Sequence, residues 1–321
     1  MNLQRALAVA LSSLLLFGCS AKQKRADFTE ETPQPGSPGG SGGYYSMLYV
    51  GEGQELEIQH ILEMDDNDVN ACLVEAGGIL RLRDIEIRKT GDATGMVVSG
   101  GGHAACAARS GGRLYVTGAG TIITEGYGAH AIYGDGKDTG IEADGLILET
   151  RGDTSAGVFL KNGAHAFMKN CSLKTEQGNA PCILLSGDSV FEGEKVSMQA
   201  KAALIEILDG NPRITISEGD LTGDIRVADE GGLDLQLNAT KWIGTVPSDS
   251  ESSLNMEMTA DCSWTMTEDA SVSGFVDRDQ TLANIDSNGY IIYYDYDNPI
   301  NAWIGGQTLP LPGGGFLTPI I

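Results

Sequence analysis

The chain has 321 residues, of which 41% are hydrophobic, and 21 Lys and Arg residues face 44 Asp and Glu residues, a net charge of −23. This acidic excess disfavours nucleic acid and anionic lipid head groups as partners, because both are bound by clusters of Lys and Arg. The hydrophobic content is sufficient for one elongated domain.

The N-terminus has the features of an export signal. Arg5 precedes a short apolar stretch, residues 6–17, which is too short to span a bilayer as a permanent helix. The following "LFGC" resembles the lipobox of bacterial lipoproteins, which implies cleavage before Cys19 and its modification by acyl chains such as palmitate. We therefore expect residues 1–18 to be a lipoprotein signal peptide. A plain secretory signal with an unrelated cysteine is the alternative.

Two segments separate this signal from the body of the chain. Residues 19–43 are rich in Pro, Gly, Ser and charge, and we expect a lipidated, disordered tether. Residues 44–70 interrupt the later repeats, so we expect an N-terminal cap that includes a first irregular coil and protects strand edges. Asp65, Asp66 and Asp68 could hold a structural Ca²⁺, but they lack the Gly and the distal Glu of an EF-hand loop, which favours a solvated acidic turn. No other metal or cofactor is expected.

A short apolar pattern recurs over residues 71–243, at intervals that fall from 34 residues between Cys72 and Cys106 to 20 between Ile205 and Ile225. Two apolar columns, separated by one freely varying residue, indicate strands with one buried face. Units of this kind stack, since none can bury its own face alone. The first column is the predicted stacked core ladder: Cys72, Cys106, Ile132, Val158, Cys182, Ile205 and Ile225. The second is Val74, Ala108, Gly134, Leu160, Leu184, Ile207 and Val227.

The length of the repeat indicates the fold class. Units of 20–26 residues with three short strands fit one turn of a parallel β-helix, and no run has the helical periodicity of ankyrin or tetratricopeptide repeats. We predict an all-β, single-stranded, right-handed parallel β-helix of about 8–11 coils with irregular N- and C-terminal caps, the hand following the general rule for parallel crossovers. The longest interval contains "TGMVVSGGGHA", which we expect to form a loop.

Five cysteines follow Cys19, namely Cys72, Cys106, Cys171, Cys182 and Cys262. Three of them fall in the first column, which favours small buried hydrophobic residues. Cys72 and Cys106 would lie on successive coils about 4.8 Å apart, so a bridge between them is an alternative. Parallel strands in register orient the two sulfurs poorly for such a bridge.

The sequence offers no recognisable catalytic constellation. The motifs of pectate lyases and polygalacturonases are missing, and the only adjacent aspartates are Asp65 and Asp66, in the expected cap. His103, His130 and His165 have similar neighbours, and we expect exposed turn residues rather than metal ligands. No serine has the two partners that a triad requires. We therefore predict that the protein is not an enzyme.

Residues 244–321 loosen the pattern and are expected to form the last coils and a C-terminal cap. Leu254, Met256 and Met258 alternate, as do Trp264 and Met266, and each set indicates one strand. Three prolines near the end prevent regular central pairing. The aromatic residues of this segment either cap the helix or form a ligand-facing platform for sugars: Tyr290, Tyr293, Tyr294, Tyr296 and Trp303.

The stretches "SWTMTEDASVSGFVD", "NIDSNGYIIYYD" and "GGQTLPLPGGGFLTP" resemble the C-terminal end of adhesin-like β-helix proteins of bacterial surfaces. The repeats "TEQGNAPCILLSG" and "RGDTSAGVFLKNG" are similar to repeats of those proteins, and the fold resembles that of autotransporter passenger domains. The resemblance covers residues 79–321. It implies a surface location and an adhesive role without catalytic residues, whereas the lipobox is a departure from that family.

These observations favour a lipid-anchored, cell-surface, adhesin-like protein that binds a glycan or a protein partner without turnover. One alternative is a polysaccharide lyase or glycoside hydrolase of the pectin-lyase-like β-helix class, and another is a structural envelope spacer. Ser20, next to the lipidated cysteine, is not the Asp that retains some lipoproteins at an inner membrane, which favours the outer membrane or the cell surface.

Overall fold

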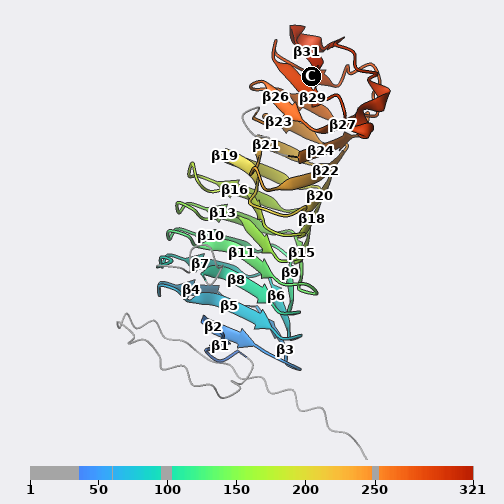
Figure 1. The fold of residues 1–321 in the computed structure, drawn as a ribbon. Coiled ribbons are helices and arrows are strands. Elements are labelled where there is room, and N and C mark those ends of the chain that lie inside the picture. Colours follow the sequence, from blue (N-terminus) through green and yellow to red (C-terminus); the bar gives the residue numbers. More distant parts are fainter. Residues whose placement is uncertain (1–35, 60, 95–102, 248–252, 321) are drawn as a thin grey trace, which may run out of the picture.

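A computed structural model describes residues 36–59, 61–94, 103–247 and 253–320. Parallel strands stack coil upon coil into a β-solenoid of about ten turns with 55% strand (Figure 1). The described residues contain no α-helix, but the 3₁₀ helices η2 (Pro299–Trp303) and η3 (Pro312–Gly314) occur near the end. They also contain no helix that is long and apolar enough to cross a membrane. The predicted parallel β-helix is confirmed.

Each coil contributes strands to three faces. The first face contains β2 (Tyr44–Val50), β5 (Asn70–Glu75), β8 (Ala104–Arg109), β11 (His130–Asp135), β14 (Val158–Lys161) and β17 (Ile183–Leu185). The second face contains β3 (Glu55–Ile58), β6 (Ile79–Arg83), β9 (Arg113–Thr117), β12 (Gly140–Asp144), β15 (His165–Lys169), β18 (Val190–Glu194), β20 (Arg213–Ser217), β22 (Gly232–Asn238), β24 (Ser253–Met258) and β27 (Gly274–Asp277). The third face contains β4 (Ile61–Met64), β7 (Glu86–Lys89), β10 (Thr121–Thr124), β13 (Ile147–Thr150), β16 (Ser172–Thr175), β23 (Lys241–Ile243), β25 (Ser263–Thr265) and β28 (Ile285–Asp286).

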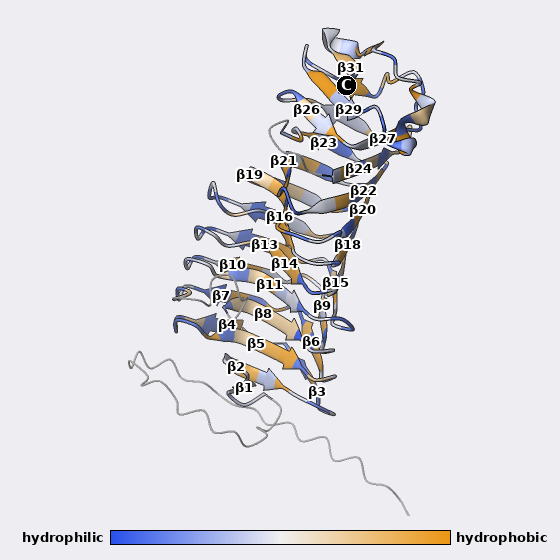
Figure 2. Ribbon diagram, viewed as in Figure 1, coloured by the Kyte–Doolittle hydropathy of each residue, from blue (hydrophilic) through white to orange (hydrophobic). Residues whose placement is uncertain are grey.

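Two longer strands pass through a corner and pair with both the first and the third face. They are β19 (Ser197–Ile207) and β21 (Asp220–Val227), which pair with each other with a register shift after Gln199. Alternate residues of the strands point inward in every face, so the core is a continuous apolar column and polar residues concentrate at the turns (Figure 2).

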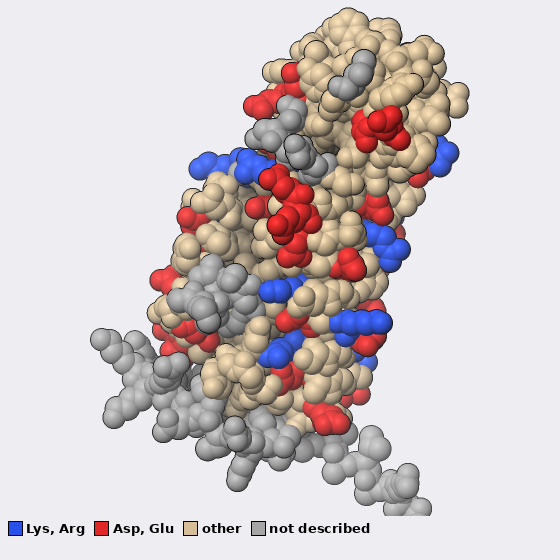
Figure 3. All heavy atoms as spheres, in the orientation of Figure 1, with Lys and Arg blue, Asp and Glu red and all other residues tan. Residues whose placement is uncertain are grey.

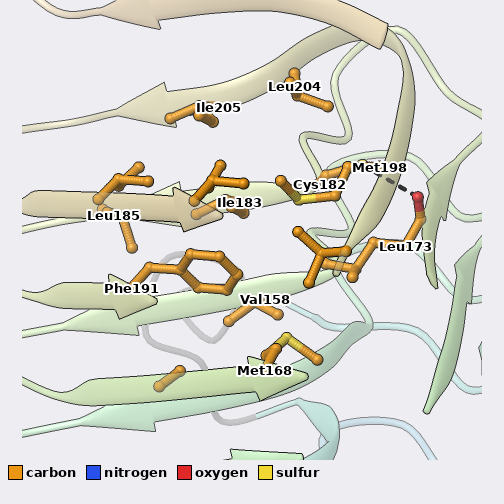
Figure 4. Packing of buried hydrophobic residues seen from close by; sticks show 14 of the residues in the cluster. Val158, Met168, Leu173, Cys182, Ile183, Leu185, Phe191, Met198, Leu204 and Ile205 are labelled. Carbon is orange, nitrogen blue, oxygen red and sulfur yellow. Dashed lines mark hydrogen bonds between the residues drawn. The ribbon is translucent and has the colours of Figure 1, made fainter. Parts of the chain in front are cut away.

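The first four members of the predicted core ladder are direct partners on successive coils and are fully buried. The fifth is wrong by one residue, because Val158 lies opposite Ile183 rather than Cys182. Ile183 then lies opposite Ile205, and the three side chains stack in Figure 4. Likewise Leu185, not Leu184, belongs to the second column.

The shift arises because the turn glycine comes one residue earlier in the later coil: Gly187 is four residues after Ile183, whereas Gly163 is five residues after Val158. Cys182 occupies the place of Gly157 in the preceding coil, since its carbonyl accepts a hydrogen bond from the Val158 amide. Its side chain is nevertheless buried, with Sγ 3.7 Å from the carbonyl oxygen of Leu173 (Figure 4).

The second column contains one glycine for a steric reason. A Cβ at Gly134 would lie 2.8 Å from Cδ1 of Ile141 and 2.9 Å from Cδ2 of Leu160. Gly134 therefore leaves room for the larger side chains on the adjacent face and the next coil, and the interior remains closely packed.

At the N-terminal end the order begins earlier than expected. Within residues 36–43, part of the predicted disordered tether, β1 (Gly39–Ser41) forms a strand that pairs antiparallel with β2. β2 itself lies in register with β5, so the predicted irregular cap begins with a regular coil. β1 covers the backbone edge that β2 would otherwise expose.

The C-terminal strands follow the expected alternation. Leu254, Met256 and Met258 are buried in β24, and Trp264 stacks on Trp242 at a centroid distance of 4.7 Å. A small final sheet contains β26 (Ala270–Val272), β29 (Ile291–Asp295), β30 (Leu309–Pro310) and β31 (Phe316–Ile320). Pro319 lies in β31 beyond the two residues that pair with β30, so its missing N–H interrupts no ladder on that side.

Candidate functional site

The outward residues of the first face form a second ladder, which we call the outer ladder. It runs over successive coils in direct register: Tyr49, Leu73, Ala107, Tyr133, Phe159, Leu184, Glu206 and Arg226. The ladder is apolar as far as Leu184, and Phe159 is only 2% exposed. It becomes charged at Glu206 and Arg226. The outward face therefore changes character between β17 and β19.

A hollow opens where this change occurs. One part, of about 540 Å³, is lined by β19, β21, Pro247 and Glu268, and a second part, of about 300 Å³, is lined by β14, β17 and neighbouring turns. The two parts share Glu206, Leu208 and Arg226 and thus form one outer groove that crosses successive coils. Acidic side chains gather on this side of the molecule around β19 and β21 (Figure 3).

The groove contains two charged side chains for which the described residues supply no ion pair. Glu206 and Arg226 are neighbours on adjacent coils, but neither makes an ion pair or a side-chain hydrogen bond within the described residues. Burial raises the pKa of the Glu206 carboxyl above its ordinary value, and Arg226 opposes that shift only in part. Asp224 accepts a hydrogen bond from the Thr245 amide at 3.1 Å, and Glu268 is exposed at the rim.

Some charges elsewhere on the solenoid are paired from coil to coil. Lys169 lies 2.8 Å from Glu194 on the second face, and on the third face Arg151 contacts Glu125 at 2.9 Å. Such exposed pairs contribute little to stability. Other charges, such as that of the exposed Glu142, also make no ion pair within the described residues, so what sets Glu206 apart is that it is half-buried and lines the outer groove.

The opposite end of the outer ladder is closed by a polar network. The Tyr49 hydroxyl donates a 2.9 Å hydrogen bond to Glu75, and burial together with that carboxylate raises the pKa of Tyr49 to about 12. Arg109 lies 3.5 Å from Glu75 and places its guanidinium 3.9 Å from the centroid of the Tyr44 ring. Glu75 and Arg109 form an ion pair with each other here, so we regard this end as structural.

The acidic turn after β4 does not gather its aspartates around one point. Asp68 accepts hydrogen bonds from both the amide and the hydroxyl of Thr94, while Lys89 donates to the carbonyls of Val69 at 2.6 Å and Asp66 at 3.4 Å. Lys89 is fully buried, which lowers its pKa to about 7 in spite of the nearby aspartates. No group of three or more His, Cys, Asp or Glu in the described ranges is arranged to hold a metal ion.

Two of the three histidines contradict the prediction of exposed turn residues. His103 and His130 are buried where first-face strands begin: His130 is the first residue of β11, and His103 directly precedes β8. His103 Nε2 lies 2.7 Å from the carbonyl of Gly91, and burial lowers its pKa to about 4. His130 Nδ1 accepts a 3.1 Å hydrogen bond from the Ala156 amide. His165 is exposed, as expected.

The predicted aromatic platform does not assemble as one surface. Tyr294 is buried, and its hydroxyl donates to the carbonyl of Gln307 at 3.0 Å. Trp303 is half-buried and donates from Nε1 to the carbonyl of Phe275 at 2.6 Å. Tyr293 alternates with Tyr294 along β29 and faces the other way, while Tyr290 and Tyr296 are 36% and 57% exposed. Part of the set therefore packs in the cap, because strand alternation divides it.

The five cysteines in the described part are buried and free. Cys72 and Cys106 are direct partners on successive coils, and their thiols contact each other, which together with burial raises the pKa of Cys106. Such cysteines behave as small core residues rather than as reactive thiols.

Sequence reasoning missed Glu206, Leu208, Asp224 and Arg226. The signal was present in the residue between the two core columns, which the prediction treated as free to vary. Read as a column in the predicted alignment, this position changes from Phe159 and Ile183 to Glu206 and Arg226, and the structure places Leu184 there instead of Ile183. Cys19, the signal peptide, residues 20–35 of the tether and most of the "TGMVVSGGGHA" loop lie outside the described residues.

Comparison with known proteins adds no relative. No protein-family model, no curated protein and no solved structure matches this chain. The resemblance to adhesin-like β-helix proteins therefore stays a prediction, and the argument for function depends on the geometry of the outer groove.

Proposed function

We propose that the chain is a lipid-anchored, surface-exposed, adhesin-like β-helical protein that binds a partner molecule, a glycan or a protein, in the outer groove without chemical turnover. The observation that carries this proposal is the groove itself, where the half-buried Glu206 and the exposed Arg226, which make no ion pair within the described residues, lie beside the exposed Leu208. The described residues supply neither an ion pair for these charges nor full apolar cover for Leu208. A bound ligand can supply both kinds of contact.

The experiment compares two exposed aliphatic side chains that lie on different parts of the solenoid. Leu208 is 41% exposed in the groove, and Ile243 is 46% exposed on the third face. Full-length Leu208→Asp and Ile243→Asp chains are tested beside the wild type for saturable binding to whole cells and to a glycan array. We expect Leu208→Asp to lose binding and Ile243→Asp to keep it. Absence of any binding by the wild type, or equal losses in both variants, would refute the proposal.

The anchor has its own test. If Cys19 is lipidated, the wild-type chain expressed in a bacterial host should incorporate labelled palmitate. The labelled chain should then be found in the membrane fraction. The Cys19→Ala variant should lose the label and leave the membrane fraction. A labelled Cys19→Ala chain would contradict this part of the proposal while leaving the groove unaffected.

A second candidate function is hydrolysis or lyase cleavage of a polysaccharide. It is favoured by Glu206, since a carboxyl group with a raised pKa suits a general acid, and by Asp224 on the neighbouring coil as a second carboxylate. Release of new reducing ends from a polysaccharide panel, abolished by Glu206→Gln, would establish it in place of simple binding.

A further inference from the structure

We infer that the occupant of the outer groove is an extended, basic segment of a partner protein. This inference rests on the proposed function and names the chemistry of the partner. Three carboxylates line the groove, from Glu206, Asp224 and Glu268, against the single cation of Arg226. An anionic ligand such as a uronic acid polymer would meet net repulsion, whereas a cationic one would gain several attractive contacts.

The shape of the groove also limits the ligand. It crosses the coils from β14 to β21, which at about 4.8 Å per coil is roughly 15 Å, or about five residues of an extended peptide. Leu184 and Leu208 provide apolar contacts in the same groove. A segment in which cationic and small apolar residues alternate would place both kinds of side chain opposite suitable partners.

A protein segment fits the lining better than a glycan does. Sugar rings are held largely by stacking on exposed aromatic faces, and the aromatic side chains that line the groove among the described residues are Phe159 and His130. Phe159 is 2% exposed and His130 is 1% exposed, so neither presents a free ring face. The exposed tyrosines Tyr290 and Tyr296 belong to the C-terminal end and not to the groove.

The half-buried carboxylate is the strongest single indication. Glu206 is half-buried, so water cannot solvate it fully, and Arg226 on the neighbouring coil offsets the cost of burial only in part, without forming an ion pair within the described residues. A Lys or Arg of a ligand would remove that cost, because a charge-assisted hydrogen bond in a partly desolvated site is stronger than one at an open surface. Arg226, by contrast, would repel the same ligand and thereby restrict its register.

The test uses fluorescence anisotropy with the full chain and short labelled peptides. One peptide alternates Lys with Val, a second alternates Glu with Val, and a neutral chito-oligosaccharide and an oligogalacturonate represent the glycans. We expect the Lys peptide to bind at least about tenfold more tightly than any other probe. Tighter binding of either glycan would refute the inference while leaving the proposed function standing, and no binding of any probe would count against both.

Charge variants separate the groove from the general negative charge of the protein. Glu206→Gln should weaken binding of the Lys peptide about tenfold, and Arg226→Ala should strengthen it several-fold. Glu142→Gln is the matched control, since it removes one charge from the exposed outward side of β12 on the second face. Equal effects of Glu206→Gln and Glu142→Gln would show non-specific attraction and overturn the inference.

Discussion

The two halves of the outer ladder differ in burial and in charge, although both belong to the same repeated strand. From Leu73 to Phe159 the outward residues are as well buried as the inward ones, and the aromatic rings of Tyr133 and Phe159 meet at 5.4 Å. From Glu206 onward the same position is charged and borders a groove. The inward residues stay apolar throughout. The stack is therefore stabilised from inside, and its outward residues are free to differ from coil to coil.

Substitutions in the inward core ladder should reduce the free energy of unfolding more than substitutions on the outward side. Val158→Asp would place an unpaired carboxylate between Ile132 and Ile183, where no water can solvate it. We expect a loss of about 5 kcal/mol in the free energy of unfolding, measured by denaturant titration. A variant as stable as the wild type would contradict the register described here.

The effect of truncating an outward side chain on stability should differ between the coils before β17 and the groove after it. Phe159→Ala removes a buried ring and should cost about 3–4 kcal/mol. Leu208→Ala, in the groove, removes a side chain that is 41% exposed and should cost less than about 1 kcal/mol. Equal losses in chemical denaturation would show that the two halves of the outer face are not different in kind.

Lys89 provides a test of the interior at one corner of the first coils. Its pKa is about 7 in the folded chain and 10.5 in the unfolded chain, so the unfolded state binds more protons between these values. Above pH 10.5 Lys89 is neutral in both states and its burial costs no charge desolvation, so this stability is complete there. The stability is lost as the pH falls through about 7, where the buried amine becomes charged. Relative to Lys89→Met, which resembles Met64 on the preceding coil, the wild type should gain about 3–4 kcal/mol in the free energy of unfolding from pH 7 to pH 10.

The measurement is the difference in unfolding free energy between the wild type and Lys89→Met at several pH values. This difference isolates Lys89 from the tyrosines and cysteines that also titrate in the alkaline range. A difference that does not change with pH would mean that the Lys89 ammonium remains charged in the folded state.

The smallest effect is expected at Glu206. Its folded pKa is raised, so the ionised carboxylate destabilises the fold at neutral pH, and this cost disappears as the pH falls below the unfolded value near 4.5. Glu206→Gln should therefore raise the melting temperature slightly at pH 7 and leave it unchanged at pH 4. A lower melting temperature at pH 7 would assign Glu206 a structural role instead of one in binding.

The sequence was sufficient for the fold because stacking repeats a physical requirement in every coil. Ile132 and Val158 face the same core and must both be apolar, so period and repeat length could be read directly. The exact residue in register was less accessible: Cys182 and Ile183 are both apolar, and the pairing of the strands, not the place of the turn glycine, decides between them. Apolar pattern alone therefore fixes a strand to within one residue.

The groove was harder to predict for a different reason. Glu206 looks like any surface glutamate until the burial of its side chain and its neighbours on adjacent coils are known. The buried histidines show the converse problem, since a Gly-rich context indicated exposed turns, whereas the start of a first-face strand places His103 and His130 inside. The aromatic cluster near the C-terminus failed because strand alternation sends Tyr293 and Tyr294 to opposite sides.

Hydrogen exchange of the full chain, with and without the Lys-containing peptide, shows which part of the solenoid the peptide contacts. We expect slower exchange on peptide binding for the amides around Glu206–Leu208 and Asp224–Ala228, with no change along the second face. Protection confined to the second face or to the C-terminal cap would place the binding surface elsewhere and contradict the assignment of the outer groove.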